Sequence, residues 1–226
     1  KMDTKTKYKA KKIKIVFFDI DDTLRVKDTE YMPDSIKTVF KGLKSKDILT
    51  GIASGRATYG VVPEIKALNP DVFVTINGSY VEDDKGKALY SRPISKELIE
   101  SYIAWCHEVG IDYGFVGAHK AVVSNRKPLI DNAMSPVYGV CDVEPDFYLG
   151  NDVYQMFTFE DVGDDLKLPE VLQEDLRLVR WHPNASDVVL NGISKASGVA
   201  HVLEKEGLNP ENVLFFGDGP NEIGRA

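Results

Sequence analysis

Apolar and polar positions over the first third of the chain predict strands that alternate with helices. Segment 13–18 is almost continuously apolar, which is typical of a central parallel strand covered by helices on both faces. Segment 32–46 carries apolar residues at helical spacing behind a Pro-Asp helix start. Further buried strands are expected at 47–54 and 71–76, with a helix over 57–69 between them that bends or restarts near Pro63. This order predicts a Rossmann-like parallel sheet with right-handed crossovers.

The pattern changes after the third strand. A hairpin is expected around Asp84 to Gly86, then a helix over 95–109 and several short strands separated by Pro and Gly. The β-α-β rhythm returns at about residue 186 and closes with the apolar segment 212–217. We therefore expect an α/β fold in which a second α/β domain interrupts a parallel-sheet core. In chain order we expect a flexible basic tail 1–12, core 13–82, insert 83–185 and core 186–226.

Composition narrows the possible functions. The net charge of −7 hides a more acidic body, since residues 1–12 hold six lysines and one aspartate and leave 22 basic against 34 acidic residues. Such a body disfavours non-specific nucleic-acid binding, which needs a positive face. No apolar run approaches the roughly 20 residues that span a bilayer. Cys106 and Cys141 have no metal or redox spacing, which fits a reducing cytoplasm. Together these features predict a cytoplasmic protein with neither a nucleic acid nor a membrane as partner.

Small and polar residues follow each predicted core strand, where ligands of parallel sheets collect. The first strand runs into "DIDDT", the second into "SGR", the third into "NGS" and the last into "GDGPNE", while "GISK" precedes the last helix. Asp19 and Asp21 are two apart on an extended strand end, so their side chains point the same way. With Asp218 and Glu222 they form an acid-rich oxygen set suited to Mg²⁺.

The same strand ends offer groups for a phosphate. Lys195 adds a positive charge at a helix start, where free N–H groups already favour anions. Ser54 and the backbone of Gly55 can donate hydrogen bonds to phosphate oxygens. The reaction that this set favours is phosphoryl transfer to a carboxylate, with a second carboxylate as general acid and base. Asn77 either lines this cleft or only turns the chain.

The ordered motifs "DIDDT", "SGR", "GISK" and "GDGPNE" resemble the haloacid dehalogenase superfamily of phosphohydrolases, in its large-capped, Cof-like branch. The resemblance implies that Asp19 is the nucleophile and that Asp21 is the general acid and base. It also implies that Ser54 and Lys195 bind the phosphoryl group and that the insert is a cap over a small phosphorylated metabolite. Asp21 would give the Mg²⁺ a backbone oxygen.

Four further positions complete this assignment. Asp218 is implied as a metal ligand, and Thr23 and Asn221 as supporting residues that orient the aspartates, Asn221 beside the phosphate. Glu222 stands where the family usually has aspartate, which weakens its assignment to the metal. Asp22 is expected only to turn the chain.

Other activities fit part of the pattern. A phosphosugar mutase would use the same chemistry but return the phosphoryl group to a sugar. A receiver-like phospho-acceptor also places acids and a lysine around Mg²⁺, although it lacks a long insert. A non-catalytic phosphate binder is a further alternative, and the sequence leaves the oligomeric state open. The expected function is a Mg²⁺-dependent phosphatase acting on a sugar phosphate or a similar monoester.

Overall fold

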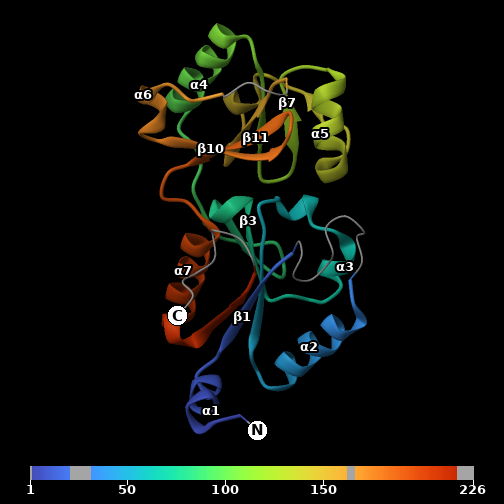
Figure 1. Ribbon diagram of the computed structural model, residues 1–226, viewed down its shortest axis with the longest axis vertical. Helices are drawn as coiled ribbons and strands as arrows, with labels where there is room; N and C mark the ends of the chain where they lie inside the picture. Colours follow the sequence, from blue (N-terminus) through green and yellow to red (C-terminus); the bar gives the residue numbers. More distant parts are fainter. Residues whose placement is uncertain (1, 21–31, 162–165, 218–226) are drawn as a thin grey trace. The chain divides into compact units, whose positions relative to one another are not determined.

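The computed structural model describes residues 2–20, 32–161 and 166–217, which form two compact units (Figure 1). Unit 1 comprises Lys1–Tyr90 and Ser194–Ala226, and unit 2 comprises Ser91–Ile193. Each unit contains a six-stranded sheet of its own. The chain therefore leaves unit 1 after the predicted hairpin, later than the expected insert start at residue 83.

The sheet of unit 1 is mostly parallel. Its strand order is β12-β1-β2-β3-β4-β5, in which β12, β1, β2 and β3 pair in parallel and β4 pairs antiparallel with β3. The predicted Rossmann-like core is confirmed by this topology. The strands span β1 (Ile15–Asp19), β2 (Leu49–Ala53), β3 (Val72–Thr75), β4 (Tyr80–Asp83), β5 (Ala88–Ser91) and β12 (Val213–Phe216).

Helices cover both faces of this sheet, as the apolar strands require. Helices α2 (Asp34–Ser45) and α3 (Pro63–Lys66) pack through Phe40 and Ile65 against one face of the sheet. Helix α7 (Lys195–Glu206) packs against the opposite face, and Figure 1 shows it across the sheet from α2 and α3. Each face thus buries alternate residues of the same strands.

The expected helix over 57–69 is shorter than predicted. It consists of the 3₁₀ turn η1 (Thr58–Gly60) and the four-residue α3, separated by an extended Val62. Pro63 explains the break, because a proline disfavours helical geometry in the residue before it. One more 3₁₀ turn, η4 (Pro210–Asn212), leads into β12.

Residues 2–12 contain a helix, where we expected a flexible tail. Helix α1 (Thr4–Lys11) begins at Asp3, whose Oδ1 accepts a hydrogen bond of 2.8 Å from the Thr6 N–H. Such a cap and the basic last turn both favour a helix. None of its residues is buried, so local interactions rather than packing form it.

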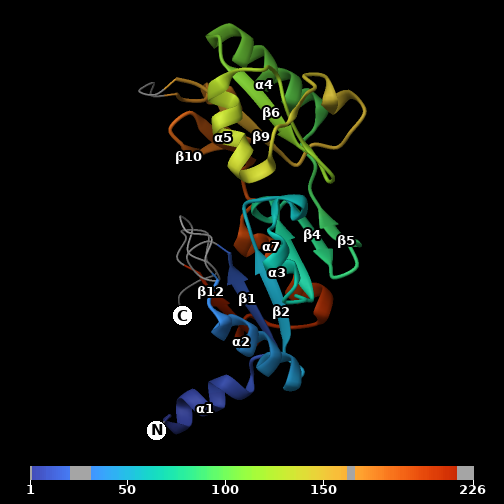
Figure 2. The same ribbon diagram turned by 90° about the vertical axis from the view of Figure 1, so that its right-hand side faces the viewer.

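Unit 2 is built around a largely antiparallel sheet with the order β10-β11-β9-β6-β7-β8. Helices α4 (Lys96–Val109) and α6 (Glu170–Gln173) cover one face, while α5 (Pro128–Tyr138) contacts the other through the Tyr138–Phe157 ring pair (Figure 2). The remaining elements are β6 (Asp112–Val116), β7 (Ala121–Val123), β8 (Asp142–Val143), η3 (Phe147–Leu149), β9 (Gln155–Phe159), β10 (Leu176–His182) and β11 (Ala185–Leu190).

Strand β11 lies in unit 2, although we expected residues 186–190 to begin the second core segment. It pairs antiparallel with both β9 and β10, which fixes it in the middle of that sheet. In the part of the chain that the structure describes, no helix is long and apolar enough to cross a membrane.

Candidate active site

Asp19 lies at the end of β1 and forms an ion pair with Lys195. Lys195 Nζ is 3.1 Å from Asp19 Oδ1, and both side chains are about one-sixth exposed, at 15% and 16%. The Ile20 N–H donates a second hydrogen bond, 2.9 Å long, to the same oxygen. Lys195 is the first residue of α7 and follows Ser194, whose side chain caps that helix. The acid at the strand end and the lysine at the helix start, which the sequence placed at one sheet edge, are thus in contact.

Strand register brings the other predicted groups to the same edge. Asp19 is level with Ala53 of β2, and Ala53 is level with Val74 of β3. The residues that follow each strand therefore leave the sheet together, as carboxyl ends of parallel strands do.

Ser54 follows β2 and is 4% exposed. Its hydroxyl accepts a 3.0 Å hydrogen bond from the Arg56 N–H, so the hydroxyl proton is left for another acceptor. No described residue accepts that proton. A buried O–H that still has a proton to donate is suited to an anionic ligand.

Residues 76–78 after β3 form the 3₁₀ turn η2, which is held to the Ser54 loop. The Asn77 N–H donates to Ser54 O at 3.1 Å, and the Ile76 N–H donates to Arg56 O at 3.0 Å. A Cβ added to Gly55 would lie 3.0 Å from Asn77 Oδ1, so the Asn77 side chain lies against that glycine. The prediction that Asn77 touches a phosphate stays untested, but its side chain lies beside the predicted phosphate loop.

The turn η2 has an unusual backbone. Ile76, Asn77 and Gly78 have consecutive positive φ angles of 51°, 53° and 96°. A β-branched residue such as isoleucine rarely adopts this region, and each such residue costs of order 1–3 kcal/mol. The sequence "NGS" suggested a turn, but it carried no signal for a left-handed Ile76.

Gly217 brings the last strand-end motif to Asp19. A Cβ built on Gly217 would lie 2.9 Å from Asp19 Cβ and 3.5 Å from Asp19 Oδ2, so the two backbones are in close contact. The predicted ligand Asp218 is the next residue along the chain. Five of the predicted site residues lie outside the described residues, namely Asp21, Thr23, Asp218, Asn221 and Glu222, as does the expected turn residue Asp22.

In the described part of the site, one oxygen of Asp19 is suited to bind a hard cation. Both described hydrogen bonds to Asp19 end on Oδ1, whereas no described residue donates to Oδ2, which faces Gly217. A free carboxylate oxygen is the ligand that Mg²⁺ prefers. Residues 2–20, 32–161 and 166–217 hold no group of three His, Cys, Asp or Glu side chains that could bind a metal by themselves.

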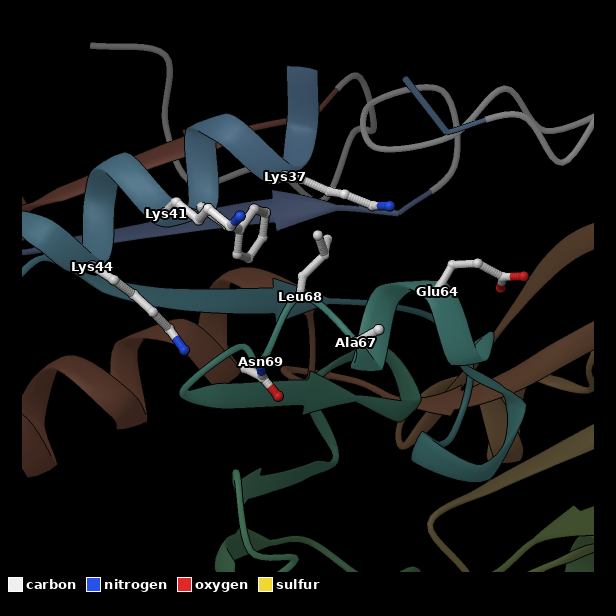
Figure 3. A pocket seen from close by; sticks show the side chains of 8 residues that line it. Lys37, Lys41, Lys44, Glu64, Ala67, Leu68 and Asn69 are labelled. Atoms are coloured by element: carbon white, nitrogen blue, oxygen red, sulfur yellow. The ribbon is translucent and has the colours of Figure 1, made fainter. Parts of the chain in front are cut away.

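A separate pocket lies between α2 and α3 (Figure 3). Its volume is about 170 Å³, and Phe40 and Leu68 provide apolar walls. Lysines 37, 41 and 44 line it from α2, and Asn69 lies on the opposite side. None of its lining residues is a predicted site residue, so this pocket is separate from the strand-end chemistry.

The sequence matches the haloacid dehalogenase-like hydrolase family over residues 16–224, so the chain belongs to that family. The prediction of this family and its Cof-like branch is confirmed, and with it the phosphatase class of enzyme. The fold is confirmed by a solved hypothetical protein of Geobacillus kaustophilus, which is 34% identical at a TM-score of 0.82. That similarity covers 92% of this chain and 81% of the other.

Two curated relatives describe more of the family. A protein of Streptococcus pyogenes serotype M6, provisionally named a bifunctional phosphatase/peptidyl-prolyl cis-trans isomerase, is 57% identical over 98% of this chain. The chain spans 47% of that relative's length. The 5-amino-6-(5-phospho-D-ribitylamino)uracil phosphatase YbjI of Escherichia coli is 24% identical over 93% of this chain and 80% of its own.

Proposed function

We propose that this chain is a Mg²⁺-dependent phosphohydrolase that cleaves a small phosphorylated metabolite through an aspartyl-phosphate on Asp19. The observation that carries the proposal is the Asp19–Lys195 pair at the carboxyl end of β1, with the buried Ser54 hydroxyl at the same sheet edge. A carboxylate nucleophile, a cation and a free O–H donor are the parts that phosphoryl transfer needs.

The proposed reaction has two steps. A carboxylate oxygen of Asp19 attacks phosphorus, the bond from phosphorus to the ester oxygen breaks, and the leaving alcohol takes a proton from Asp21. Water then attacks the phosphorus of the aspartyl-phosphate and gives a proton to Asp21, which releases inorganic phosphate and restores the Asp19 carboxylate. One acid/base residue therefore serves both steps.

Lys195, Ser54 and Gly55 hold the phosphoryl group during both steps. Lys195 sits at the N-terminus of α7, where the helix dipole adds to its positive charge. The Ser54 O–H and the Gly55 N–H supply hydrogen-bond donors. Fixed donors of this kind stabilise the charge that spreads over the equatorial oxygens in the transition state.

Mg²⁺, when bound, would neutralise the phosphate charge that Asp19 must approach. Asp19 Oδ2 and the backbone of Asp21 would hold it, with Asp218 and Glu222. Thr23 and Asn221 would orient the aspartates.

The substrate class is a sugar phosphate or a similar small monoester. The proposal draws support from YbjI, whose name gives a phosphorylated ribityl compound as substrate. Unit 2 would act as the cap that selects among such substrates.

The test measures phosphate release from p-nitrophenyl phosphate with and without Mg²⁺. We expect Asp19→Asn to lower kcat by about 10³-fold or more, because the amide is no nucleophile. Asp47→Asn is the matched control, since Asp47 is exposed and its φ of 56° suits asparagine equally well. Undiminished release by Asp19→Asn would overturn the nucleophile assignment.

The same assay separates the alternatives. A mutase would convert one phosphosugar into its isomer without net phosphate release. A phospho-acceptor would accumulate a stable aspartyl-phosphate and stop after one turnover. Either result would replace the hydrolase proposal.

A further inference from the structure

The strained turn η2 contacts the predicted phosphate-binding groups on two sides. Its Ile76 and Asn77 N–H groups donate to the carbonyls of Arg56 and Ser54, as described above. On the other side, a Cβ added to Gly78 would lie 1.9 Å from Ser194 O and 3.3 Å from Lys195 N. The missing side chain of Gly78 is therefore what allows the start of α7 to lie on the turn.

A second glycine permits the same approach from the helix. A Cβ on Gly198 would lie 2.5 Å from Val74 Cγ1 and 3.0 Å from Gly78 Cα. Gly198 is buried one turn into α7, so the helix and the turn meet backbone to backbone. A single residue with a side chain at either position would push the helix start away.

We propose that the turn η2 sets the distance between Lys195 and Asp19, which makes Gly78 a positioning residue for phosphoryl transfer. Its kinetic consequence rests on the proposed function. Strain in a backbone persists where surrounding contacts hold it in place, and such strain gathers at functional sites. Here the contacts that hold the turn are the Ser54 loop and the N-terminus of α7. The turn thus links the hydroxyl donor and the lysine in one rigid arrangement.

The first experiment compares two alanine substitutions that impose the same backbone strain. Gly78 and Gly86 both have positive φ angles, 96° and 80°, but a Cβ on Gly86 meets nothing within 4 Å. We expect Gly78→Ala to lower kcat/KM by roughly 10- to 100-fold, because small displacements of a positioned group are costly. Gly86→Ala should stay within about twofold of the wild type, since its strain moves no residue of the site. Equal activities of the two variants would overturn the inference.

The second experiment asks whether Gly78 acts through Lys195. If it does, Gly78→Ala should cost little further activity in a Lys195→Ala background, because interacting residues are non-additive. A merely structural role of Gly78 would instead give the same loss in both backgrounds. Full additivity would therefore contradict the inference even if Gly78→Ala alone lowers kcat/KM.

Two controls keep the result decisive. Gly198→Ala alters the same contact without a positive φ, and it replaces Gly78→Ala if that variant does not fold. A crystal structure of either variant measures the distance from Lys195 Nζ to Asp19 Oδ1 directly, and an unchanged 3.1 Å would overturn the inference without any assay. A wild-type chain that releases no phosphate would refute the proposed function, while the structural measurement would still decide the role of the turn.

Discussion

The two units place their charged groups differently. Unit 1 gathers Asp19, Lys195 and the Ser54 hydroxyl at one end of a parallel sheet, with Oδ2 and a hydroxyl proton unused by any described residue. Unit 2 distributes many of its charges over separate ion pairs. These pairs are Glu160–Arg180, Lys127–Asp112, Arg126–Asp131 and the contacts of Lys120 with Asp142 and Glu144.

The comparison shows that the meeting of a carboxylate, a cation and a hydroxyl at one sheet edge marks a site better than the number of charges does. The ion pairs of unit 2 stand apart from one another, and Glu160 buries an Oε2 that has no hydrogen-bond partner in the described part of the chain. Among the described residues, none donates to Asp19 Oδ2, because Lys195 and Ile20 both bind Oδ1. Four predictions test this contrast, and the largest expected effect comes first.

Removing the cation of the unit 1 pair should affect activity far more than stability. We expect Lys195→Met to lower phosphate release by about 10²- to 10³-fold, as the loss of a transition-state donor does. Lys205→Met on the same helix is the matched control, because Lys205 is exposed. Steady-state kinetics and thermal unfolding of both variants measure the two effects. A Lys195→Met variant with wild-type activity would contradict the contrast.

Removing the cation of the Glu160–Arg180 pair in unit 2 should affect stability far more than activity. The Glu160 side chain is 1% exposed and Arg180 is 44% exposed, so Arg180→Met leaves a buried carboxylate without its partner. We expect the free energy of unfolding to fall by about 2–3 kcal/mol, less than for a fully buried pair because water screens Arg180. Trp105 and Trp181 both lie in unit 2, so tryptophan fluorescence during urea unfolding reports on that unit.

The control for this prediction is Lys120→Met, which breaks an exposed pair. Lys120 is 45% exposed and its partner Asp142 is 74% exposed. Its loss should lower the free energy of unfolding far less than Arg180→Met does, because water screens an exposed pair. Equal losses for Arg180→Met and Lys120→Met would show that the burial of Glu160 is irrelevant.

Alkaline pH should weaken unit 2. Burial raises the pKa of Cys106 to about 12 and, together with nearby charges, that of Cys141 to about 11, and it raises the pKa of Tyr102 well above its usual value. An unfolded thiol loses its proton near pH 9, whereas the folded Cys106 keeps it. The contribution of the buried thiol to the free energy of unfolding is therefore fully present below pH 9. It is lost as the pH rises toward 12, by up to about 1.4 kcal/mol per pH unit for one buried group.

Urea unfolding at pH 8 and pH 10.5, followed by tryptophan fluorescence, measures this loss. The Cys106→Ala variant should show a shallower decline between the two pH values, because it lacks one of the titrating groups. An identical decline in the variant would contradict the role of Cys106. Both thiols are buried and free, so a thiol reagent should label them only after unfolding.

The smallest effect is expected at Gly42, inside helix α2. A Cβ there would meet nothing within 4 Å, and the residue lies in a helix interior. Gly42→Ala should raise the free energy of unfolding by about 0.5–1 kcal/mol, because alanine favours helix over glycine. Amide hydrogen exchange of α2 would measure the gain, with kcat unchanged. A loss of stability would show that the helix surface is constrained in some other way.

The sequence predicted the parallel core well because that core depends on local pattern. Strand ends followed by small and charged residues identified Asp19, Ser54 and Lys195, and the structure brings these residues to one sheet edge. Family resemblance then supplied roles that spacing alone could not give. Those roles stay predictions, and several of the residues lie outside the described part of the chain.

What the sequence could not predict depends on tertiary contacts. The membership of β11 in unit 2 follows from its pairing with β9 and β10, which no local pattern encodes. Helix α5 was not predicted, because it lies in a stretch rich in Pro and Gly. Pro128 stands in its first turn, where proline is tolerated. The left-handed Ile76 and the contact of Gly78 with Ser194 arise from packing across the sheet edge.

The division of unit 1 into two stretches has a consequence during synthesis. Asp19 and Lys195 are 176 positions apart, and all of unit 2 leaves the ribosome between them. Until α7 and β12 arrive, β1 has an unpaired edge and the apolar face around Phe17 and Val74 is uncovered. When β12 pairs with β1, it closes that edge and brings Gly217 to Asp19. A nascent chain therefore contains the proposed nucleophile early, but this residue meets Lys195 and Gly217 only after the sheet is complete.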